Sequence, residues 1–265
     1  MNLQPYLDFT QELAAAAADV ILPYYGKTDC GLESKDDDSP VTLADRGAEE
    51  VMRAMIEKKF PGHGIVGEEY GTQNADAEWV WILDPIDGTK SFIAAVPLFG
   101  TLIGLLHNGK PVVGCVNQPV LNQLLLGDNE TTTLNGKKVC VRPTTKISES
   151  LLLTTDPIRP HKVHDGAAYD KLASKARTVR TWGDCYGYLM LSSGWADIML
   201  DPILAAWDLL PVLPCLQGAG VTVSSWDGTP IAEFDAARGG DKMFTCIASA
   251  PAIHSEVVDI LNGRA

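Results

Sequence analysis

The sequence predicts an α+β arrangement in its first half and an α/β arrangement in its second half. Two helical periodicities come first, strands joined by Asn-Gly turns follow, and strands then alternate with helices from about residue 150 onward. With 46% hydrophobic and 21% charged residues, the chain has the composition of a folded globular protein. Its 265 residues suit one large or two small domains, and we place a soft boundary between parts 1–145 and 146–265.

The first half is predicted to begin with two helices. Apolar residues recur at helical spacing over residues 3–25, until Pro23 and Gly26 end the run. The acidic, Gly-containing stretch 26–40 reads as a solvated, mobile loop. Thr42, with Asp45 three residues later, is expected to open a second helix that ends before Pro61.

Strands are predicted after these helices, because the hydrophobic period changes at Gly64. Short buried strands are expected at residues 65–66 and 80–83. Residues 99–107 and 111–119 flank Asn108-Gly109, a dipeptide typical of tight hairpins. A strand at 123–126 precedes a second turn pair, Asn135-Gly136.

The second half is predicted to alternate. The strands are expected at residues 151–155, 178–181, 196–200, 221–223 and 244–248, and the helices at 167–176, 184–193, 204–217 and from about 252. Such alternation is typical of an α/β arrangement.

The charge balance excludes some functions. The chain carries 21 Lys and Arg against 34 Asp and Glu, a formal net charge of −13. Nucleic acid and anionic membranes need clustered cations, so we expect neither as a partner. The N-terminus lacks the features of a secretory signal, and no segment approaches the roughly 18 apolar residues of a membrane span. Six scattered cysteines fit buried thiols in a reducing compartment, and we expect a cytoplasmic protein.

Carboxylates follow several predicted elements. Glu68 follows one strand, Asp84 and Asp87 follow another, and Asp208 stands near the start of a late helix. Strand ends are where α/β sheets place ligand sites, so these side chains can converge on one cleft. A set of oxygen ligands without His or Cys favours a hard cation, and Mg²⁺ fits best.

The run from Asp84 to Thr89 adds a phosphate site. Pro85 turns the chain, so that Asp84, Asp87 and the Ile86 carbonyl can face one pair of metals. Gly88 and Thr89 would offer unpaired N–H groups at a helix start, which suit a phosphate oxygen.

These segments resemble the ordered motifs of the inositol monophosphatase family. The motifs are Lys35…Asp45, Gly67-Glu68-Glu69, the run Trp81 to Thr89, and Trp207-Asp208 followed by Gly218-Ala219-Gly220-Val221. The resemblance covers nearly the whole chain. It implies a layered αβαβα sandwich of the sugar phosphatase type and a Mg²⁺-dependent, lithium-sensitive phosphomonoesterase, usually a homodimer.

The resemblance also implies roles for single residues. Two or three Mg²⁺ per site would be held by Glu68, Asp84, the Ile86 carbonyl and Asp87 from the first part, and by Asp208 from the second. Thr89, hydrogen-bonded to Asp45, would help to activate a metal-bound water, and the N–H groups of Gly88 and Thr89 would hold the phosphate. No covalent phosphoenzyme is implied, and Lys35 would belong to a mobile flap.

The substrate is predicted from two further segments. The sequence is similar to the histidinol-phosphate phosphatase branch of the family at residues 180–188 and 199–202. The form Asp-Gly-Thr-Lys-Ser-Phe at residues 87–92 also fits that branch. Histidinol phosphate carries an ammonium and an imidazole, which extra carboxylates would favour. Asp184 and Asp201 are the expected contacts, with Tyr186 or Tyr188 as stacking walls. The alternative is an inositol-1-monophosphatase or a broad sugar or nucleotide phosphatase, because Asp201 also suits a hydroxyl.

Simpler interpretations remain for some residues. Asp184 and Asp208 could be helix N-caps. His161 and His164 are expected to be surface residues rather than metal ligands, and the cysteines, Trp81 and Trp207 to be packing residues. A haloacid-dehalogenase phosphatase needs Asp-x-Asp, whereas Asp84 and Asp87 are three residues apart. A P-loop enzyme needs Gly-x-x-x-x-Gly-Lys-Ser/Thr, and the sequence does not contain this run.

Overall fold

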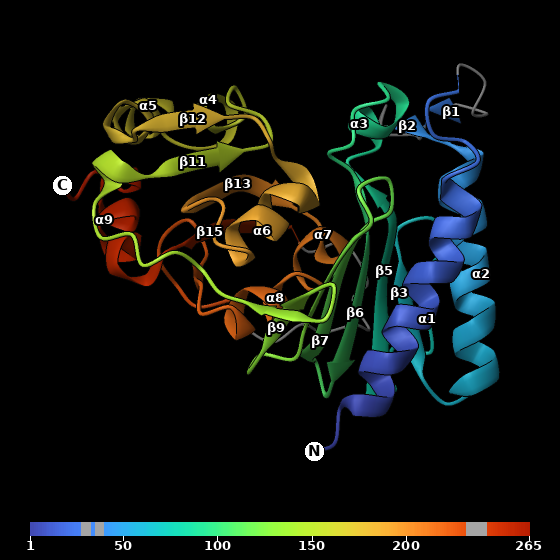
Figure 1. Ribbon diagram of the computed structural model, residues 1–265. Coiled ribbons are helices and arrows are strands. Elements are labelled where there is room, and N and C mark those ends of the chain that lie inside the picture. The colour runs from blue at the N-terminus through green and yellow to red at the C-terminus, as the bar shows by residue number, and fades with distance from the viewer. Residues whose placement is uncertain (28–32, 35–39, 232–242) are drawn as a thin grey trace.

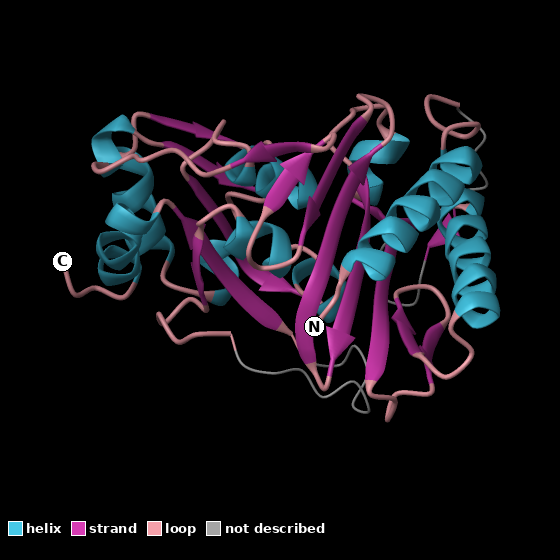
Figure 2. Cartoon of the chain, turned by 60° about the horizontal axis from the view of Figure 1, so that its bottom comes forward, coloured by secondary structure: helices cyan, strands magenta, loops and turns pink. Residues whose placement is uncertain are grey.

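The computed structural model describes residues 1–27, 33–34, 40–231 and 243–265. The chain forms five layers, in the order helices, sheet, helices, sheet, helices (Figure 1). In Figure 2 the two long N-terminal helices and the helix next to the C-terminus lie at opposite ends of the molecule. The predicted αβαβα sandwich is therefore confirmed.

The outer layer of the first half consists of two helices, as predicted. They are α1 (Gln4–Ile21) and α2 (Leu43–Lys59), and they cover one face of the larger sheet (Figure 1). At the start of α2, Thr42 Oγ1 accepts a hydrogen bond from Ala44 N–H, and Asp45 accepts one from Thr42 N–H. The predicted capping box is thus formed.

The loop between these helices is described only in part. It contains the short antiparallel strands β1 (Glu33–Ser34) and β2 (Pro40–Val41). Lys35 of the predicted flap and Cys30, one of the six cysteines, lie outside the described residues.

The larger sheet has the strand order β10-β9-β8-β7-β6-β5-β3-β4. Its strands are β3 (Gly64–Gly67), β4 (Gly71–Gln73), β5 (Trp79–Asp87), β6 (Gly100–His107), β7 (Lys110–Gln118), β8 (Gln123–Gly127), β9 (Thr132–Leu134) and β10 (Lys137–Val139). Among these strands β3 and β5 pair parallel, and the other neighbours pair antiparallel. A short helix, α3 (Thr89–Ile93), follows β5.

Both predicted Asn-Gly turns are confirmed. Asn108 and Gly109 have φ angles of 50° and 76°, and Asn135 and Gly136 have φ angles of 49° and 75°. A two-residue turn of this kind needs positive φ at both positions, which Asn tolerates and Gly adopts freely. These turns fix the registers of β6 with β7 and of β9 with β10.

The smaller sheet has the order β12-β11-β13-β15-β14. Its strands are β11 (Leu151–Thr154), β12 (Thr178–Arg180), β13 (Ile198–Leu204), β14 (Thr222–Ser224) and β15 (Phe244–Ser249). The helices around it are α4 (Pro160–Val163), α5 (Gly166–Lys175), α6 (Asp184–Ser192) and α9 (Pro251–Leu261), and a 3₁₀ turn spans Ile147–Glu149. The change of sheet thus falls between β10 and β11.

The helix predicted over residues 204–217 is wrong as a single element. The structure has two short helices there, α7 (Ala206–Leu209) and α8 (Leu213–Gly218). Pro211 lies in the break, and a proline inside a helix removes a hydrogen bond and clashes with the preceding turn. Pro214 falls in the first turn of α8, where proline is tolerated.

A row of glycines lets this broken segment lie flat on the larger sheet. Gly104, Gly114 and Gly127 are direct neighbours across β6, β7 and β8. A Cβ atom would lie 3.1 Å from Pro211 Cα at Gly104 and 2.6 Å from Cys215 Cα at Gly127, and at Gly114 it would overlap the Pro211 carbonyl oxygen. Backbone therefore packs on backbone, and α7 is brought against β5 and β6.

One hydrophobic core joins the two sheets. It includes Ile82 and Leu102 from the larger sheet, Met199 from the smaller sheet and Leu209 from α7, and the half-buried Trp207 packs against it. Trp81 is fully buried in a second cluster beneath α1 and α2. The two tryptophans therefore pack as predicted.

The cysteines follow the prediction in part. Cys115, Cys185, Cys215 and Cys246 are buried and free, whereas Cys140 is exposed. Among the described residues, no helix is long and apolar enough to cross a membrane.

Replacing Gly114 with Ala is expected to lower the free energy of unfolding by about 1–3 kcal/mol, because the new methyl group would overlap the Pro211 carbonyl oxygen. Gly62→Ala is the matched control, since nothing lies within 4 Å of its added Cβ. Urea unfolding monitored by circular dichroism measures both variants. Equal stabilities would contradict this close packing of backbone on backbone.

Candidate metal and phosphate site

A bulge at the end of β5 brings two aspartates to the same side of the strand. Asp84 pairs with Leu102 and Asp87 with Gly100, so two residues of β5 face one residue of β6 between these pairs. In a regular strand residues three apart point to opposite faces, and the extra residue of a bulge reverses this. Asp84 Oδ1 also accepts a hydrogen bond of 3.1 Å from Ile86 N–H within the bulge.

Asp208 joins these two aspartates from α7. It lies in the first turn, where its carboxylate accepts a hydrogen bond of 2.8 Å from Ala205 N–H. Carboxylate oxygens of Asp84, Asp87 and Asp208 lie within 4.8 Å of one another. Three of the ligands predicted from the sequence are therefore brought together, two from the first half of the chain and one from the second.

The electrostatics of this cluster suit a divalent cation. Burial and the negative charges of Glu68, Asp87 and Asp208 raise the pKa of Asp84 well above its usual range. Burial and the negative charges of Asp184 and Asp208 raise the pKa of Asp87 well above its usual range. Burial also raises the pKa of Asp208 to about 6. Carboxylates that disfavour one another's ionisation are relieved by a bound cation, and an all-oxygen set fits Mg²⁺.

Glu68 lies beside the cluster, in the turn after β3. Its N–H donates a hydrogen bond of 3.1 Å to the carbonyl of Leu83, the residue before Asp84. Its negative charge raises the pKa values of Asp84, Asp208 and Asp45, although burial is the main cause for each of them. Glu68 is therefore close enough to contribute a fourth carboxylate.

The predicted hydrogen bond between Thr89 and Asp45 is wrong. Thr89 Oγ1 donates instead to the Ile86 carbonyl, at 3.1 Å. Asp45 is occupied by the capping box of α2, and burial raises its pKa to about 6. Since a carbonyl oxygen has two lone pairs, Ile86 can accept this bond and still face a cation.

A pocket of about 250 Å³ opens beside the cluster. It is lined by Asp87, Lys90, Thr155, Asp156, Arg159, Asp184, Tyr188, Asp201, Pro202, Ile203, Leu204 and Asp208. Lys90, Thr155, Asp156 and Arg159 were not among the predicted site residues. Thr155 and Asp156 directly follow β11, and the strand-end rule that pointed to Asp84 could also have found them.

Asp184 lies at the pocket with a strained backbone. Its φ angle is 48°, which is unusual for any residue other than glycine. Its N–H donates to Thr155 Oγ1 at 2.8 Å, and its carboxylate accepts a 3.5 Å hydrogen bond from Ser91. Burial raises its pKa to about 6, while Ser91 and Lys90 oppose this shift.

Neither aspartate of the two helix starts is an N-cap. Asp184 is the first residue of α6 rather than the residue before it, and the N–H of Cys185 donates to Asp87. Asp208 follows Ala205, the cap of α7, by three residues. Gly88, the N-cap of α3, has a φ of 83°, and a Cβ there would lie 3.0 Å from Asp184 Oδ2. The α3 and α6 starts therefore meet at the pocket.

Asp201 lines the pocket but is only 2% exposed. It accepts hydrogen bonds from the Tyr188 hydroxyl at 2.8 Å and from Thr155 N–H at 3.4 Å. Burial raises its pKa to about 7, and these two bonds oppose the shift. Asp201 therefore gains a proton readily near neutral pH.

The two tyrosines do not form stacking walls. Tyr188 is only 2% exposed and supports Asp201 through its hydroxyl. Tyr186 packs against the core, interacts with Gln123 of β8 and does not line the pocket. Residues two apart on a helix point about 200° apart, so only one of them can face the pocket.

The two histidines follow the surface prediction in part, since His161 is exposed and His164 is half-buried. His161 pairs with Asp170 at 3.2 Å, and His164 stacks on Trp226 with 4.5 Å between ring centroids. Neither belongs to the group of described residues that could hold a metal.

Comparison with known proteins gives one family across the chain. The model of the inositol monophosphatase family matches residues 2–258. A histidinol-phosphatase from Chlorobaculum parvum is 39% identical, over 82% of this chain and 85% of its own. A bifunctional phosphatase from Arabidopsis thaliana, IMPL2, is 42% identical. The match covers 82% of this chain and 63% of the Arabidopsis protein, which is longer.

Solved structures show the same fold. The structure of an inositol monophosphatase from Zymomonas mobilis has a TM-score of 0.84 and 32% sequence identity, and covers 99% of both chains. One from Anabaena has a TM-score of 0.83 and 29% identity, with coverage of 99% and 97%.

The pH dependence of stability is expected to depend on bound cations. The pKa of Asp208 is raised to about 6, so the metal-free folded state binds more protons than the unfolded state, whose aspartates titrate near about 4. Its contribution to stability is complete below about pH 4 and is lost as the pH rises through about 6. Added Mg²⁺ should therefore raise Tm more at pH 8 than at pH 5.5.

Asp84→Asn is expected to remove most of this Mg²⁺-dependent rise, because it deletes a carboxylate at the centre of the cluster. Asp19→Asn, an exposed change on α1, is the control and should behave like the unmodified protein. Differential scanning calorimetry with and without Mg²⁺ measures all three. A full Mg²⁺ response in the Asp84 variant would contradict the assignment of the cluster as a metal site.

Proposed function

Because the chain belongs to the inositol monophosphatase family and is a phosphoric monoester hydrolase, we propose that it is a Mg²⁺-dependent histidinol-phosphate phosphatase. The reaction adds water to phosphorus and breaks the bond to the ester oxygen, which releases inorganic phosphate and L-histidinol. We place this reaction in histidine biosynthesis, and no phosphorylated enzyme intermediate takes part.

The residues of the chain would divide this reaction among them. Glu68, Asp84, Asp87, Asp208 and the Ile86 carbonyl would hold two or three cations. When bound, these cations would supply an activated water and stabilise the charge on the leaving oxygen. The N–H groups of Gly88 and Thr89 would hold phosphate oxygens. Thr89 Oγ1 would also orient the Ile86 carbonyl, to which it donates.

The acidic pocket beside the cluster is the observation that carries the choice of substrate. Asp184, Asp201 and Asp156 line it, of which Asp201 is buried, Asp184 is half-buried and Asp156 is exposed. A buried carboxylate gains most from a charged partner, since charge-assisted hydrogen bonds are about twice as strong as neutral ones. The ammonium and imidazole of histidinol phosphate would supply such partners, whereas a polyol offers only hydroxyls.

The raised pKa of Asp201, about 7, fits this assignment. Without a cationic ligand the carboxyl is partly protonated near neutral pH, and an ammonium close to it would favour the ionised form. The name of the Chlorobaculum relative, a histidinol-phosphatase, supports the same substrate. So does the resemblance of residues 180–188, which include the pocket residue Asp184, to the histidinol-phosphate phosphatase branch.

Inositol 1-phosphate is the second candidate. The protonated form of Asp201 can both donate to and accept from a hydroxyl group. The Zymomonas structure is named an inositol monophosphatase. A broad specificity for sugar or nucleotide phosphates would follow if the pocket made few specific contacts.

Further properties belong to the same proposal. We propose that lithium inhibits the enzyme, that its active form is a homodimer and that it works in the cytoplasm. Four buried, free cysteines among the described residues are compatible with a reducing compartment.

The relative efficiency on several esters tests the substrate. We expect kcat/KM with Mg²⁺ to be about 100-fold or more higher for histidinol phosphate than for inositol 1-phosphate, fructose 1,6-bisphosphate and 3′-phosphoadenosine 5′-phosphate, which is about 2.7 kcal/mol of discrimination. A flat profile, or a preference for inositol 1-phosphate, would overturn the substrate but retain the phosphatase.

Asp184→Asn is expected to lower kcat/KM for histidinol phosphate at least about 10-fold more than for inositol 1-phosphate, because the change removes charge without changing shape. Asp170→Asn, which alters an exposed pair with His161, is the control and should leave both values unchanged. Equal losses on the two substrates would remove Asp184 from the specificity role.

A further inference from the structure

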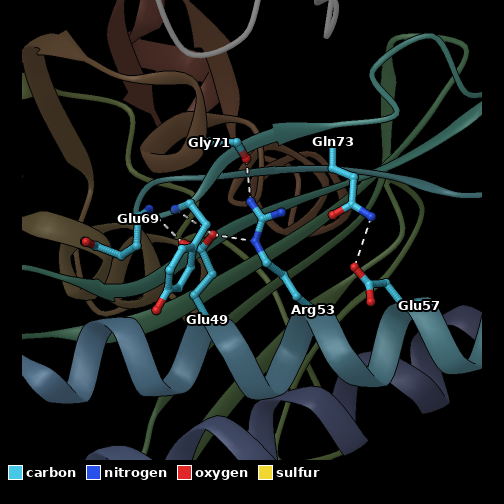
Figure 3. A network of polar contacts seen from close by, with 7 residues as sticks. Glu49, Arg53, Glu57, Glu69, Gly71 and Gln73 are labelled. Carbon is cyan, nitrogen blue, oxygen red and sulfur yellow. Dashed lines mark hydrogen bonds and ion pairs between the residues drawn. The ribbon is translucent and has the colours of Figure 1, made fainter.

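Glu49 in α2 is a fully buried carboxylate held by several donors (Figure 3). It accepts hydrogen bonds from Arg53 Nε at 2.7 Å, from Glu69 N–H at 2.8 Å and from Tyr70 N–H at 3.2 Å. Buried glutamates are rare unless they are paired. Here the partners include two backbone groups of the turn between β3 and β4, which is the turn that carries Glu68.

The backbone on both sides of Glu68 is therefore fixed. Its own N–H donates to the Leu83 carbonyl of β5, at 3.1 Å. The next two N–H groups, of Glu69 and Tyr70, are bound by Glu49. Arg53 extends the connection, since its guanidinium also donates to the Gly71 carbonyl at the far end of the turn (Figure 3).

The contact between α2 and this turn is close. A Cβ atom at Gly67, the residue before Glu68, would overlap Glu49 Oε1. Side-chain oxygens of Glu49 thus touch the residues immediately before and after Glu68. Any shift of this carboxylate must move the turn.

We propose that Glu49 is a positioning residue that sets the affinity of the acidic cluster for divalent cations by holding the turn of Glu68. This inference rests on the proposed function, because it takes Glu68 as a cation ligand. The three groups that meet Glu49 are all donors, so an acceptor-only carboxylate is required. A glutamine would direct its own N–H₂ group at a donor in either orientation.

Glu49→Gln is expected to raise the Kd for Mg²⁺ about 10- to 100-fold, the range typical for residues that orient metal ligands. Isothermal titration of the metal-free protein with MgCl₂ measures this directly. The Mg²⁺ concentration for half-maximal activity should rise in parallel, while kcat at saturating Mg²⁺ stays within about threefold. A purely structural role would lower Tm and leave the Kd unchanged.

Glu57→Gln is the matched control. Glu57 lies on the same helix and accepts a 3.0 Å hydrogen bond from Gln73 of β4, but this pair is exposed and lies beyond the turn (Figure 3). Its Mg²⁺ affinity should equal that of the unmodified protein. Glu49→Asp retains the carboxylate on a side chain that is shorter by one methylene group, so its Kd for Mg²⁺ should be intermediate. This variant replaces Glu49→Gln if the latter does not fold.

Glu68→Gln and the double variant separate the possible failures. If Glu49 acts through Glu68, Glu49→Gln should add little to the loss caused by Glu68→Gln. An unchanged Kd in Glu68→Gln would refute Glu68 as a ligand, and with it that part of the proposed function. Two results would overturn only the inference about Glu49. In the first, Glu68→Gln raises the Kd for Mg²⁺ and Glu49→Gln does not. In the second, the losses of Mg²⁺ affinity in the two single variants simply add in the double variant.

Discussion

Three aspartate carboxylates from β5 and α7 lie within 4.8 Å of one another, and like charges at this distance need rigid support from the surrounding chain. The bulge of β5 supplies it for Asp84 and Asp87, and the flat packing of the α7–α8 segment supplies it for Asp208. The shared core between the two sheets holds these two supports together. The layered fold thus serves to keep repelling groups in one place.

The neighbourhood of the cluster follows from the same constraint. Burial raises the pKa values of the three aspartates, and it also raises the pKa of Asp201, which lines the adjoining pocket, to about 7. Five carboxylates line this pocket, those of Asp87, Asp156, Asp184, Asp201 and Asp208, and Lys90 and Arg159 are the cationic side chains beside them. The histidinol phosphate proposed above would place its phosphate at the cluster and its positive charge among these carboxylates.

Local sequence signals predicted most of the fold. The turn at Asn108-Gly109 and the capping box of Thr42 each depend on residues no more than three positions apart. The hairpin and the helix start were therefore predicted correctly. The single helix over residues 204–217 was wrong, because its hydrophobic period outweighed the break that Pro211 imposes. The glycines that receive this segment are 10 to 13 residues apart, and their alignment depends on strand register.

The candidate site was predicted for similar reasons. Asp84, Asp87 and Asp208 stand at element ends and converge. The partner of Thr89 was predicted wrongly, because Asp45 accepts a hydrogen bond from Thr42, three residues before it, and Thr89 donates to the Ile86 carbonyl instead. Tyr188 could not be placed from sequence, because its role depends on the burial of Asp201 13 residues away.

The glycine row has a consequence for how relatives of this chain can diverge. Where backbone packs on backbone, no side chain can change its rotamer to absorb a substitution. Gly104, Gly114 and Gly127 therefore form one unit with Pro211 and Cys215, and a larger residue at any one of them is compatible only with a displaced α7–α8 segment. Since that segment carries Asp208 into the cluster, drift at these positions is restricted by the chemistry of a site that none of the three glycines contacts.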